Sequence, residues 1–503
     1  MPYVTRLLLI LTSASIQNEV RRQIGELWEE QREALEKIVL RFVLAEICPA
    51  TMFDFETQVA EQARELARQL LQRVLNGLES QDPQQMPHDV QDGTAGYRRL
   101  NQKTRNAYLS TLFGTVELWR YPYRYWHREV PEACIFPLEI VLGLIHGATP
   151  ALVEAVGRYM AQAGATQQSV LERLRSQHGV WWGVERLRDV TEKLSLALEG
   201  LTQEGQAARL LELLKKAEQS GGSRRPVLSV GRDGVTLREY RYRFFEHATV
   251  GTVTVYDRAG RRLGTVYLAF APELGQEQMT SRLTALIQEV LRRWEGPLPR
   301  LTYVTDAGDS ETKYYRQVLL NMAHPRTGEK LHWIRIVDYY HAAQRIWTMA
   351  ESLFGKDDPV GRAWARRMCR VLKKPGGPFR VLHSAAALRK RRKLSKSGMG
   401  EFRKAYQYIR RRTKLMQYYD YKRLNLPIGS GVTEAACKTI VTQRLKLSGM
   451  RWMKQGAQTI LNLRVVLLSG IWQPSYRKLL ETHDAGTLRT YGPLPKTITR
   501  QAA

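Results

Sequence analysis

The sequence has few cysteines, and they lie far apart. Cys48, Cys134, Cys369 and Cys437 form no closely spaced pair in the 503 residues, so the pattern of a zinc ribbon or a redox motif is missing. The disulfide framework of a small secreted domain is missing as well. The cysteine pattern therefore argues against these classes and is typical of a protein in the reducing cytoplasm.

Long apolar runs are also missing. The run Leu7–Leu11, which follows Arg6, is shorter than the apolar core of a signal peptide, and a helix-like pattern continues directly after it. No segment reaches the roughly 18 apolar residues that a membrane span needs. We therefore expect a cytoplasmic protein rather than an exported or membrane-spanning one.

Acidic residues are scarce relative to basic ones. Asp and Glu number 49 against 77 Lys and Arg, which gives a formal net charge of +28. Each phosphate that a basic side chain neutralises releases condensed counterions, so this excess favours a nucleic acid as the partner. A ribosome-associated or anionic-membrane protein would share the charge, but the chain length and the scarcity of low-complexity tails argue against both. The length predicts two to four domains.

The N-terminal part of the chain has a mainly helical pattern. Apolar residues at helical spacing, interrupted once at Cys48-Pro49, predict a helical hairpin over 1–80 that could serve dimerisation. The polar range 81–106 is rich in turn-forming residues and is interpreted as a linker. The range 107–222 begins with a short strand and continues as helices, and we expect it to bind DNA.

A helix-turn-helix candidate lies within this DNA-binding region. Helical patterns over Gln168–Gln177 and Trp182–Leu194 flank a turn at Gly179. Two short helices that merely pack together would give the same pattern. If the segment binds DNA, its second helix is the expected reader, and that helix carries Arg186 and Arg188.

After residue 222 the pattern changes from helices to strands. In chain order, the expected elements are strands Val227–Gly231, Thr249–Tyr256 and Leu263–Phe270, helix Gln276–Trp294, strand Leu301–Thr305, a helix over 310–322 and strand His332–Val337. A hairpin rather than a crossover helix follows the first strand. The order therefore predicts a mixed α+β fold with an RNase H-like sheet, not a doubly wound one.

The expected RNase H-like core is interrupted by a basic insertion. Its first part is 223–341 and its second part is 426–475, with a helical insertion over 342–425 between them and a C-terminal tail over 476–503. The insertion contains the basic run Arg389, Lys390, Arg391, Arg392 and Lys393. We expect this run to hold DNA phosphates, which position a duplex without reading its sequence.

Three carboxylates are placed where a metal site could form. Asp233 and Asp306 directly follow apolar runs, so strand ends would bring them to one edge of a sheet, and Glu434 begins a predicted helix. Oxygen ligands of this kind suit Mg²⁺ or Mn²⁺, and two such ions support phosphoryl transfer. Taken singly, each residue has a plainer interpretation as a turn residue, a helix cap or a charge at a helix N-terminus.

Four sequence stretches carry a resemblance to a known family. They are SVGRDGV around Asp233, YVTDAGDS around Asp306, DYYH from Asp338 to His341, and GSGVTEAACKTIVTQRLKLSGMRW around Glu434. They resemble bacterial insertion-sequence DDE transposases of the ISKra type, and more distantly Mutator-like and hAT transposases, over roughly 105–475. The resemblance implies an RNase H-like core with a helical insertion before the catalytic glutamate. It also implies that Asp233, Asp306 and Glu434 are catalytic metal ligands, with Asp338 and His341 as an accessory pair.

The function implied by this resemblance is DNA transposition. A transposase would cleave and join double-stranded element ends and target DNA with two Mg²⁺ or Mn²⁺ ions. It would act as a homodimer or larger oligomer in a bacterial cytoplasm, on the nucleoid when active. Two alternatives stay open: a structure-selective nuclease of the same fold, similar to a Holliday-junction resolvase, and a non-catalytic DNA-binding protein derived from a transposase. Basic residues near Glu434 are expected to hold DNA: Lys438, Arg444, Lys446 and Arg451.

Overall fold

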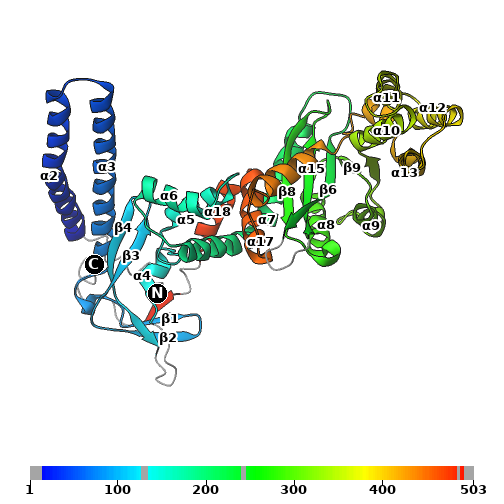
Figure 1. The fold of residues 1–503 in the computed structure, drawn as a ribbon. Helices are drawn as coiled ribbons and strands as arrows, with labels where there is room; N and C mark the ends of the chain where they lie inside the picture. The colour runs from blue at the N-terminus through cyan, green and yellow to red at the C-terminus, as the bar shows by residue number, and fades with distance from the viewer. Residues whose placement is uncertain (1–13, 126–133, 239–244, 484–487, 492–503) are drawn as a thin grey trace. The chain divides into compact units, whose positions relative to one another are not determined.

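The computed structural model describes residues 14–125, 134–238, 245–483 and 488–491 (Figure 1). The chain divides into two compact units. Unit 1 comprises Met1–Met160, Ala165–Leu194 and Tyr476–Ala503, and unit 2 comprises Ala161–Gly164 and Ser195–Ser475. The domain boundary expected near residue 222 is therefore placed earlier, within helix α7 (Val184–Glu218).

Unit 1 begins with the helical hairpin that the sequence predicts. Helices α2 (Ala14–Leu44) and α3 (Pro49–Gly77) contact each other, and the chain turns before Pro49. Proline suits the first helical position, because its missing N–H would have no partner there. Part of the seam between the helices is polar, since Gln31 Nε2 donates to Gln69 Oε1 at 3.0 Å. None of the described residues of α3 is buried.

The range 81–106 contains strands, so its interpretation as a linker is wrong. Strands β1 (Asp89–Asp92) and β2 (Ala95–Arg99) form a hairpin whose turn contains Gly93 at a φ of 57°. They belong to a four-stranded sheet with the order β11-β1-β2-β5. Strand β11 (Leu488–Tyr491) comes from the expected C-terminal tail and pairs with β1. Polar turn residues are typical of linkers and of tight hairpins alike, which is why composition misled here.

The rest of unit 1 contains one further hairpin and short helices. Their bounds are β3 (Thr104–Thr111), β4 (Gly114–Arg120), β5 (Tyr123–Tyr125), η1 (Pro83–Gln85), α4 (Pro137–Val141), α5 (Pro150–Ala161), α6 (Gln167–His178) and α18 (Trp472–Glu481). The two helices of the helix-turn-helix candidate are α6 and α7, joined through Gly179 in the left-handed conformation at φ 63°. Trp182 lies before α7 rather than on it, and its Nε1 donates to Ser110 Oγ at 3.0 Å.

Unit 2 is built on a five-stranded mixed sheet with the order β10-β9-β6-β7-β8. The strands are β6 (Val227–Arg238), β7 (Phe245–Tyr256), β8 (Arg262–Phe270), β9 (Arg300–Thr305) and β10 (Trp333–Val337). Strands β6, β7 and β8 are antiparallel, whereas β9 is parallel to β6 and to β10. The predicted order of strands and helices in this region is confirmed. Strand β6 is longer than expected, because its pairing with β7 continues past Asp233.

Helices cover both faces of this sheet. On one face, Leu228 and Val230 of β6 pack in a core with the second half of α7 and with α8 (Glu277–Arg293). Val227, which points the opposite way, packs in a second core with residues of the insertion helices. This division follows from the alternation of side chains along a strand. Short elements η2 (Leu274–Gln276), α9 (Asp309–Gln317) and η3 (Leu319–Asn321) complete the first half of unit 2.

The insertion is helical, as predicted. It comprises α10 (Tyr339–Phe354), α11 (Pro359–Val371), α12 (Gly377–Arg391), α13 (Lys396–Arg412), η4 (Thr413–Leu415) and α14 (Tyr418–Arg423). The single helix expected over 432–447 is instead α15 (Gly431–Ala436), a π-helical segment over Cys437–Thr442 and α16 (Gln443–Leu445). Helix α17 (Lys454–Leu468) follows and packs against β8.

Candidate active site

Asp233 and Asp306 occupy equivalent positions on neighbouring strands. The parallel pairing of β6 and β9 ends at Val230 and Tyr303, and each aspartate lies three residues further along the chain. Their carboxylates are close enough to interact. Burial raises the pKa of Asp233, and the nearby Asp306 carboxylate raises it further. The prediction that these two residues meet at one edge of the sheet therefore agrees with the strand register, although Asp233 lies within β6 and not after its end.

Asp338 continues this row onto the third parallel strand. It directly follows Val337, which pairs with Thr305, the residue before Asp306. Its side chain is buried and caps α10 by accepting a hydrogen bond from the N–H of Tyr340 at 2.9 Å. Three adjacent parallel strands thus carry an aspartate at the same level, which places three carboxylates along one edge of the sheet.

Helix α15 reaches the sheet over a glycine. A Cβ atom added at Gly231 of β6 would lie 2.0 Å from Thr433 Oγ1 and 2.7 Å from Thr252 Oγ1, far inside contact distance. The two threonine hydroxyls are hydrogen-bonded to each other at 2.8 Å, which ties α15 to β7. Because Glu434 follows Thr433, this close approach brings the glutamate to the edge that carries Asp233.

A hydrogen-bonded chain connects Asp338 to Glu434. The Oδ2 atom of Asp338 lies 2.7 Å from His341 Nδ1 and accepts a hydrogen bond from Ser430 Oγ at 2.9 Å. Ser430 Oγ also lies 2.9 Å from Glu434 Oε1, and His341 Nδ1 is 3.7 Å from the same oxygen. The hydrogen bond to Asp338 raises the pKa of His341, and the Asp306 and Glu434 carboxylates raise it further. Burial alone would raise the pKa of Asp338, but hydrogen bonds from His341, Tyr340 and Ser430 lower it.

A fifth carboxylate, Glu311, stands beside Asp306. A Cβ atom added at Gly308 would be 2.5 Å from Glu311 Oε2 and 3.4 Å from Asp306 Oδ1, so the two side chains flank the same point. Burial raises the pKa of Glu311, and the carboxylates of Asp306 and Asp233 raise it further. The site therefore concentrates negative charge in a half-buried place, an arrangement that a bound cation would relieve.

The segment after Glu434 is π-helical and is held by a buried arginine. Arg464 Nε donates to the carbonyl of Ile440 at 2.9 Å, and its other nitrogens contact the carbonyls of Thr439 and Ala161. The same segment begins with Cys437, whose Sγ donates to Asp233 Oδ2 at 3.5 Å. Burial raises the pKa of Cys437, and the neighbouring Asp233 raises it further, so the thiol stays protonated.

The donors at this edge suit a divalent cation. Asp338, His341 and Glu434 each offer a ligand atom, and these atoms all lie within 4.8 Å of one another. Asp233 and Asp306, which the sequence predicts as metal ligands, do not belong to this close group. Asp306 is near enough to act electrostatically on His341 and on Asp233. Carboxylate oxygens suit Mg²⁺ or Mn²⁺, whereas an imidazole nitrogen also suits transition metals. The residues present therefore could hold a divalent cation without selecting one, with Glu434 common to the expected set and to the close group.

Two of the arginines expected to hold DNA have contacts within the fold. Arg444 is only 1% exposed and lies over the ring of Trp452, so its assignment as a DNA-binding residue is corrected. Arg186 donates to the backbone carbonyls of Tyr108 and Gly147, each at 3.0 Å, and its expected role as a reader stays a prediction. Neither contact could be foreseen, because the partners of both arginines come from folding and not from helical periodicity.

The other expected DNA-binding residues are largely at the surface. Lys438, Lys446 and Arg451 are exposed, and so is Arg188, which donates to Gln167 Oε1 at 3.1 Å. In the insertion, Lys390, Arg391, Arg392 and Lys393 are exposed and Arg389 is partly buried. Arg392 NH1 donates to the carbonyl of Leu353, and Arg389 Nε contacts Met399 Sδ. These two arginines therefore help to fold the insertion.

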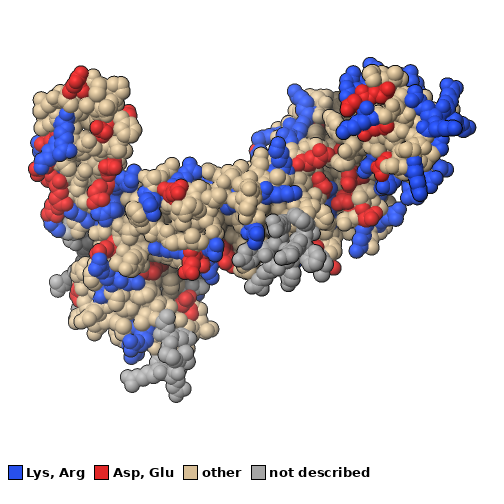
Figure 2. Space-filling view, in the orientation of Figure 1, with Lys and Arg blue, Asp and Glu red and all other residues tan. Residues whose placement is uncertain are grey.

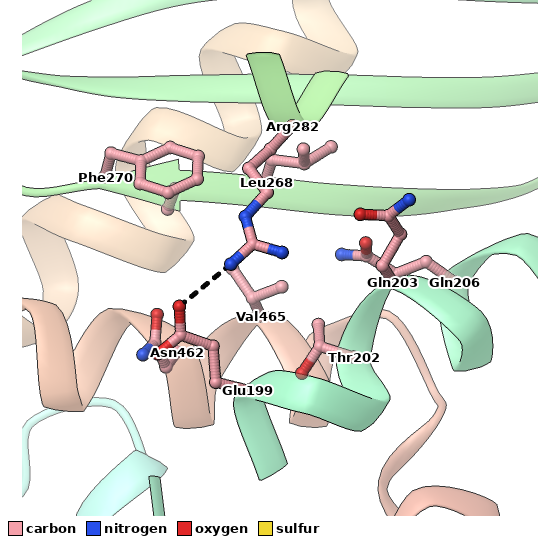
Figure 3. A pocket seen from close by; sticks show the side chains of 10 residues that line it. Glu199, Thr202, Gln203, Gln206, Leu268, Phe270, Arg282, Asn462 and Val465 are labelled. Atoms are coloured by element: carbon pink, nitrogen blue, oxygen red, sulfur yellow. Dashed lines mark hydrogen bonds and ion pairs between the residues drawn. The ribbon is translucent and has the colours of Figure 1, made fainter. Parts of the chain in front are cut away.

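A small cavity of unit 2 lies apart from the carboxylates. It measures about 50 Å³ and is lined by residues of α7, β8, α8 and α17, as Figure 3 shows. Arg282 NH2 and Glu199 Oε1 form an ion pair across it at 3.1 Å. Its volume admits only a few water molecules, and its lining includes none of the site residues. We assign it no part in the chemistry.

Sequence reasoning missed Gly231, Glu311, Ser430 and Arg464. A carboxylate in the first turn of a helix, such as Glu311, usually signals no more than a favourable charge at a helix N-terminus. A glycine within a strand does carry a signal, because it often marks the close approach of another segment. Gly231 within the predicted strand Val227–Gly231 is such a glycine, so the sequence did contain a signal for it.

Comparisons with known proteins do not assign the chain to a family. No model of a known protein family matches it, and no curated protein matches it in sequence. Among the described helices, none has the length and apolar character that crossing a bilayer requires.

Proposed function

We propose that the protein is a DNA transposase that cleaves and joins phosphodiester bonds with divalent metal ions. The observation that carries this proposal is the meeting of four side chains from separate parts of unit 2. Asp233, Asp306 and Asp338 stand at one level of three parallel strands, and Gly231 allows α15 to bring Glu434 to the same edge. Carboxylates gathered in this way suit two-metal phosphoryl transfer.

The architecture of unit 2 supports an RNase H-like core. An antiparallel three-stranded hairpin sheet is followed by two strands parallel to the first, and the first strand β6 lies at the centre. A helical insertion separates the strands from the helix of Glu434. This is the arrangement that the resemblance to ISKra-type transposases implies. It also explains why Glu434 lies 128 positions after Asp306 in the chain.

Each residue of the site has a definable task. Asp233, Asp306 and Glu434 would hold Mg²⁺ or Mn²⁺ ions, which activate a water or a 3′-hydroxyl and stabilise the leaving oxygen. Asp338 fixes the orientation of His341 through Nδ1, and Ser430 links this pair to Glu434. The raised pKa of His341 favours its protonated form. A protonated imidazole cannot be a metal ligand, so in this proposal His341 would position a DNA phosphate beside the carboxylates.

The surface of unit 2 favours DNA as the substrate. Lys and Arg side chains crowd the surface around α11, α12 and α13 in Figure 2, with patches of Asp and Glu among them near α11. Lys438 and Lys446 add exposed positive charge after Glu434. Such a surface attracts phosphates at long range and gives binding that weakens with salt.

The test uses the full chain and a supercoiled plasmid that carries its gene with the flanking DNA. We expect nicking that requires Mg²⁺ or Mn²⁺, followed by strand joining. Asp233→Asn, Asp306→Asn and Glu434→Gln should each abolish cleavage and leave DNA affinity largely intact. Asp309→Asn, an exposed carboxylate near the same edge, is the control and should cleave normally. Near wild-type nicking by any of the three variants would remove that residue from the site.

The same assay separates the alternatives. Nicking without joining would favour a structure-selective nuclease of the same fold. Binding without metal-dependent nicking in the wild-type chain would favour a non-catalytic DNA-binding protein. Joining of cleaved ends to a second DNA molecule is the result that only a transposase gives.

A further inference from the structure

A second hollow lies in the insertion, away from the carboxylates. It is an open depression of about 570 Å³ between α11 and α12, a size within the range of small-molecule sites. Its lining consists of Arg367, Met368, Val371, Phe379, Arg380 and His383. No carboxylate is among these described residues, so the hollow combines apolar surface with groups that attract anions.

Helical spacing gives the two walls of this hollow their composition. Arg367 and Val371 are four residues apart on α11, and Phe379 and His383 are four apart on α12, so each pair shares one side of its helix. Met368 is buried and contributes to the floor. One wall therefore presents Val371 with Arg367, and the other presents Phe379 with Arg380 and His383.

Phe379 is unusually exposed for a phenylalanine. Its relative exposure is 61%, although it lies in the first turn of a 15-residue helix with a buried side elsewhere. Exposed aromatic rings among basic side chains are the means by which proteins hold unpaired nucleobases, because every base offers a face for stacking. Arginine planes stack on bases as well, and they also pair with phosphates.

The charge of the surrounding helices selects among possible occupants. The range Pro359–Arg391, which spans α11 and α12, contains ten Lys and Arg and no Asp or Glu. The positive charge of this range does not attract a basic or neutral protein segment, whereas it attracts the phosphates of a nucleic acid. In an intact duplex the bases are stacked on one another and cannot cover Phe379. An unpaired base with its phosphates satisfies both the ring and the charges.

We propose that the hollow between α11 and α12 binds an unpaired nucleobase of a DNA strand, stacked on Phe379 with its phosphates near Arg367 and Arg380. This proposal rests on one part of the proposed function, namely that the chain binds DNA. It adds a site for single-stranded DNA, which strand cleavage and joining produce. The residues of this site are separate from the carboxylates in the sequence.

The experiment measures binding by the full chain to a duplex and to the same duplex with an overhang of about six nucleotides. The overhang carries 2-aminopurine, whose fluorescence falls when the base stacks on an aromatic ring. We expect tighter binding of the overhang DNA and a fall in fluorescence. Phe379→Ala should weaken overhang binding about tenfold, remove the fall in fluorescence and leave duplex binding within about twofold. Phe379→Trp should restore both signals.

Two controls make the result specific. Val360 has the same relative exposure of 61% and lies outside the hollow, so Val360→Ala should bind both DNAs like the wild type. An abasic overhang of equal length keeps the phosphates and removes the rings, so it should lose the tighter binding. Equal binding of the abasic and the normal overhang would overturn the proposal, and so would an equal effect of Phe379→Ala on both DNAs.

The outcomes also separate this proposal from the proposed function. Wild-type binding to the duplex, together with overhang binding that does not depend on Phe379, would overturn the base site alone. Failure of the wild-type chain to bind either DNA would overturn DNA binding as a whole. An overhang of RNA that binds at least tenfold more tightly than DNA of the same sequence would overturn DNA as the source of the base.

Discussion

Asp306 and Asp338 stand at the same level on two neighbouring parallel strands, each directly after one member of the pair Thr305 and Val337. The backbone fixes this relationship, because the N–H of Asp338 donates to the carbonyl of Thr305 at 2.8 Å. Asp306 also acts electrostatically on His341, which is hydrogen-bonded to Asp338. The expected catalytic aspartate and the expected accessory pair are therefore parts of one charged group.

Gly231 is predicted to be essential although it carries no chemistry. In Gly231→Ala the new Cβ would collide with the hydroxyls of Thr433 and Thr252, so α15 must move away from the sheet and take Glu434 with it. A displacement of about 1 Å at a catalytic group can cost about 100-fold in rate. We expect a loss of this order in metal-dependent nicking, measured on the plasmid substrate at saturating metal.

The neighbouring Gly234 provides a matched control. A Cβ added there would meet Ala248 O at 3.7 Å, an ordinary contact distance, so Gly234→Ala should cleave at near the wild-type rate. Thermal unfolding of both variants would show that each is folded. If Gly231→Ala cleaved as well as Gly234→Ala, the close approach of α15 would have no bearing on activity.

The fold of unit 2 was largely predictable, because its signals are local. Apolar alternation over β7 and β8, and the apolar run of β9, depend only on residues near in sequence. The prediction for the range 81–106 was wrong because the structure of this range depends on residues that are distant in the sequence. Its short strands are stabilised by pairing with β11, almost 400 residues away in the chain, and composition does not record such a partner.

The site was predictable only in part. Asp306 and Glu434 could be selected because they follow a strand and begin a helix. The burial of Arg444 and the role of Arg464 could not be predicted from the sequence, because both depend on packing between distant segments. Glu311 looked like a charge that favours a helix N-terminus, and only the structure shows its carboxylate beside Asp306. Sequence patterns thus identified residues with chemistry better than residues that position them.

Glu311→Gln is predicted to make the metal-free protein less sensitive to rising pH. The pKa of Glu311 is raised above its ordinary 4.5 in the fold, so its contribution to stability is full below about pH 4.5 and is lost as pH rises through the higher value. Glutamine does not ionise. With a metal chelator present, the free energy of unfolding of the variant minus that of the wild type should therefore increase from about pH 4.5 to pH 7.

A bound metal ion should reverse the stability advantage that Glu311→Gln has over the wild type without metal. Removing a carboxylate beside Asp306 lowers the attraction for a divalent cation, so Mn²⁺ should raise the unfolding temperature of Glu311→Gln less than that of the wild type. Asp309→Asn, an exposed residue in the first turn of the same helix, should respond like the wild type. An equal metal-induced shift in Glu311→Gln and the wild type would separate Glu311 from the metal site.

Arg464 is predicted to hold the π-helical segment that follows Glu434. Arg464→Met leaves two buried carbonyls and one partly buried carbonyl without this donor, and each unsatisfied buried group costs about 1–3 kcal/mol. We expect the free energy of unfolding to fall by about 3 kcal/mol or more. Arg464→Lys keeps the charge but not the planar fork, so it should recover only part of this loss. Unfolding curves that match the wild type would contradict the assignment.

The helical hairpin is predicted to join copies of the chain. Its exposed large apolar residues are Val20, Ile24, Trp28, Val39, Leu40, Val43, Leu44, Ile47, Met52, Phe53, Leu70 and Val74. A monomer rarely exposes so many apolar side chains on one element. Trp28→Gln, Leu44→Gln and Phe53→Gln together should reduce the mass measured by sedimentation to that of one chain. Glutamine at the exposed Leu298, Leu320 and Val360 of unit 2 is the control, and an unchanged mass in both triple variants would refute the prediction.

The basic run of the insertion is predicted to hold DNA without reading it. Lys390, Arg391 and Lys393 are exposed, whereas Arg389 and Arg392 have contacts within the insertion and are left in place. Changing the three exposed residues to alanine should weaken binding about equally for flanking and random DNA, because phosphate contacts are independent of sequence. The slope of log affinity against log salt should fall by about 0.9 for each DNA phosphate that the variant no longer neutralises.

A control of equal charge distinguishes a local contact from the general field. Arg22, Arg32 and Lys37 of α2 are exposed and paired with glutamates of the same helix, so their replacement by alanine removes the same number of charges elsewhere. The salt slope of this control should stay near that of the wild type. An unchanged slope in the insertion variant would take the insertion out of the DNA path. Weaker binding of the flanking DNA alone would instead make this run a reader of sequence, because contacts to phosphates alone weaken both DNAs together.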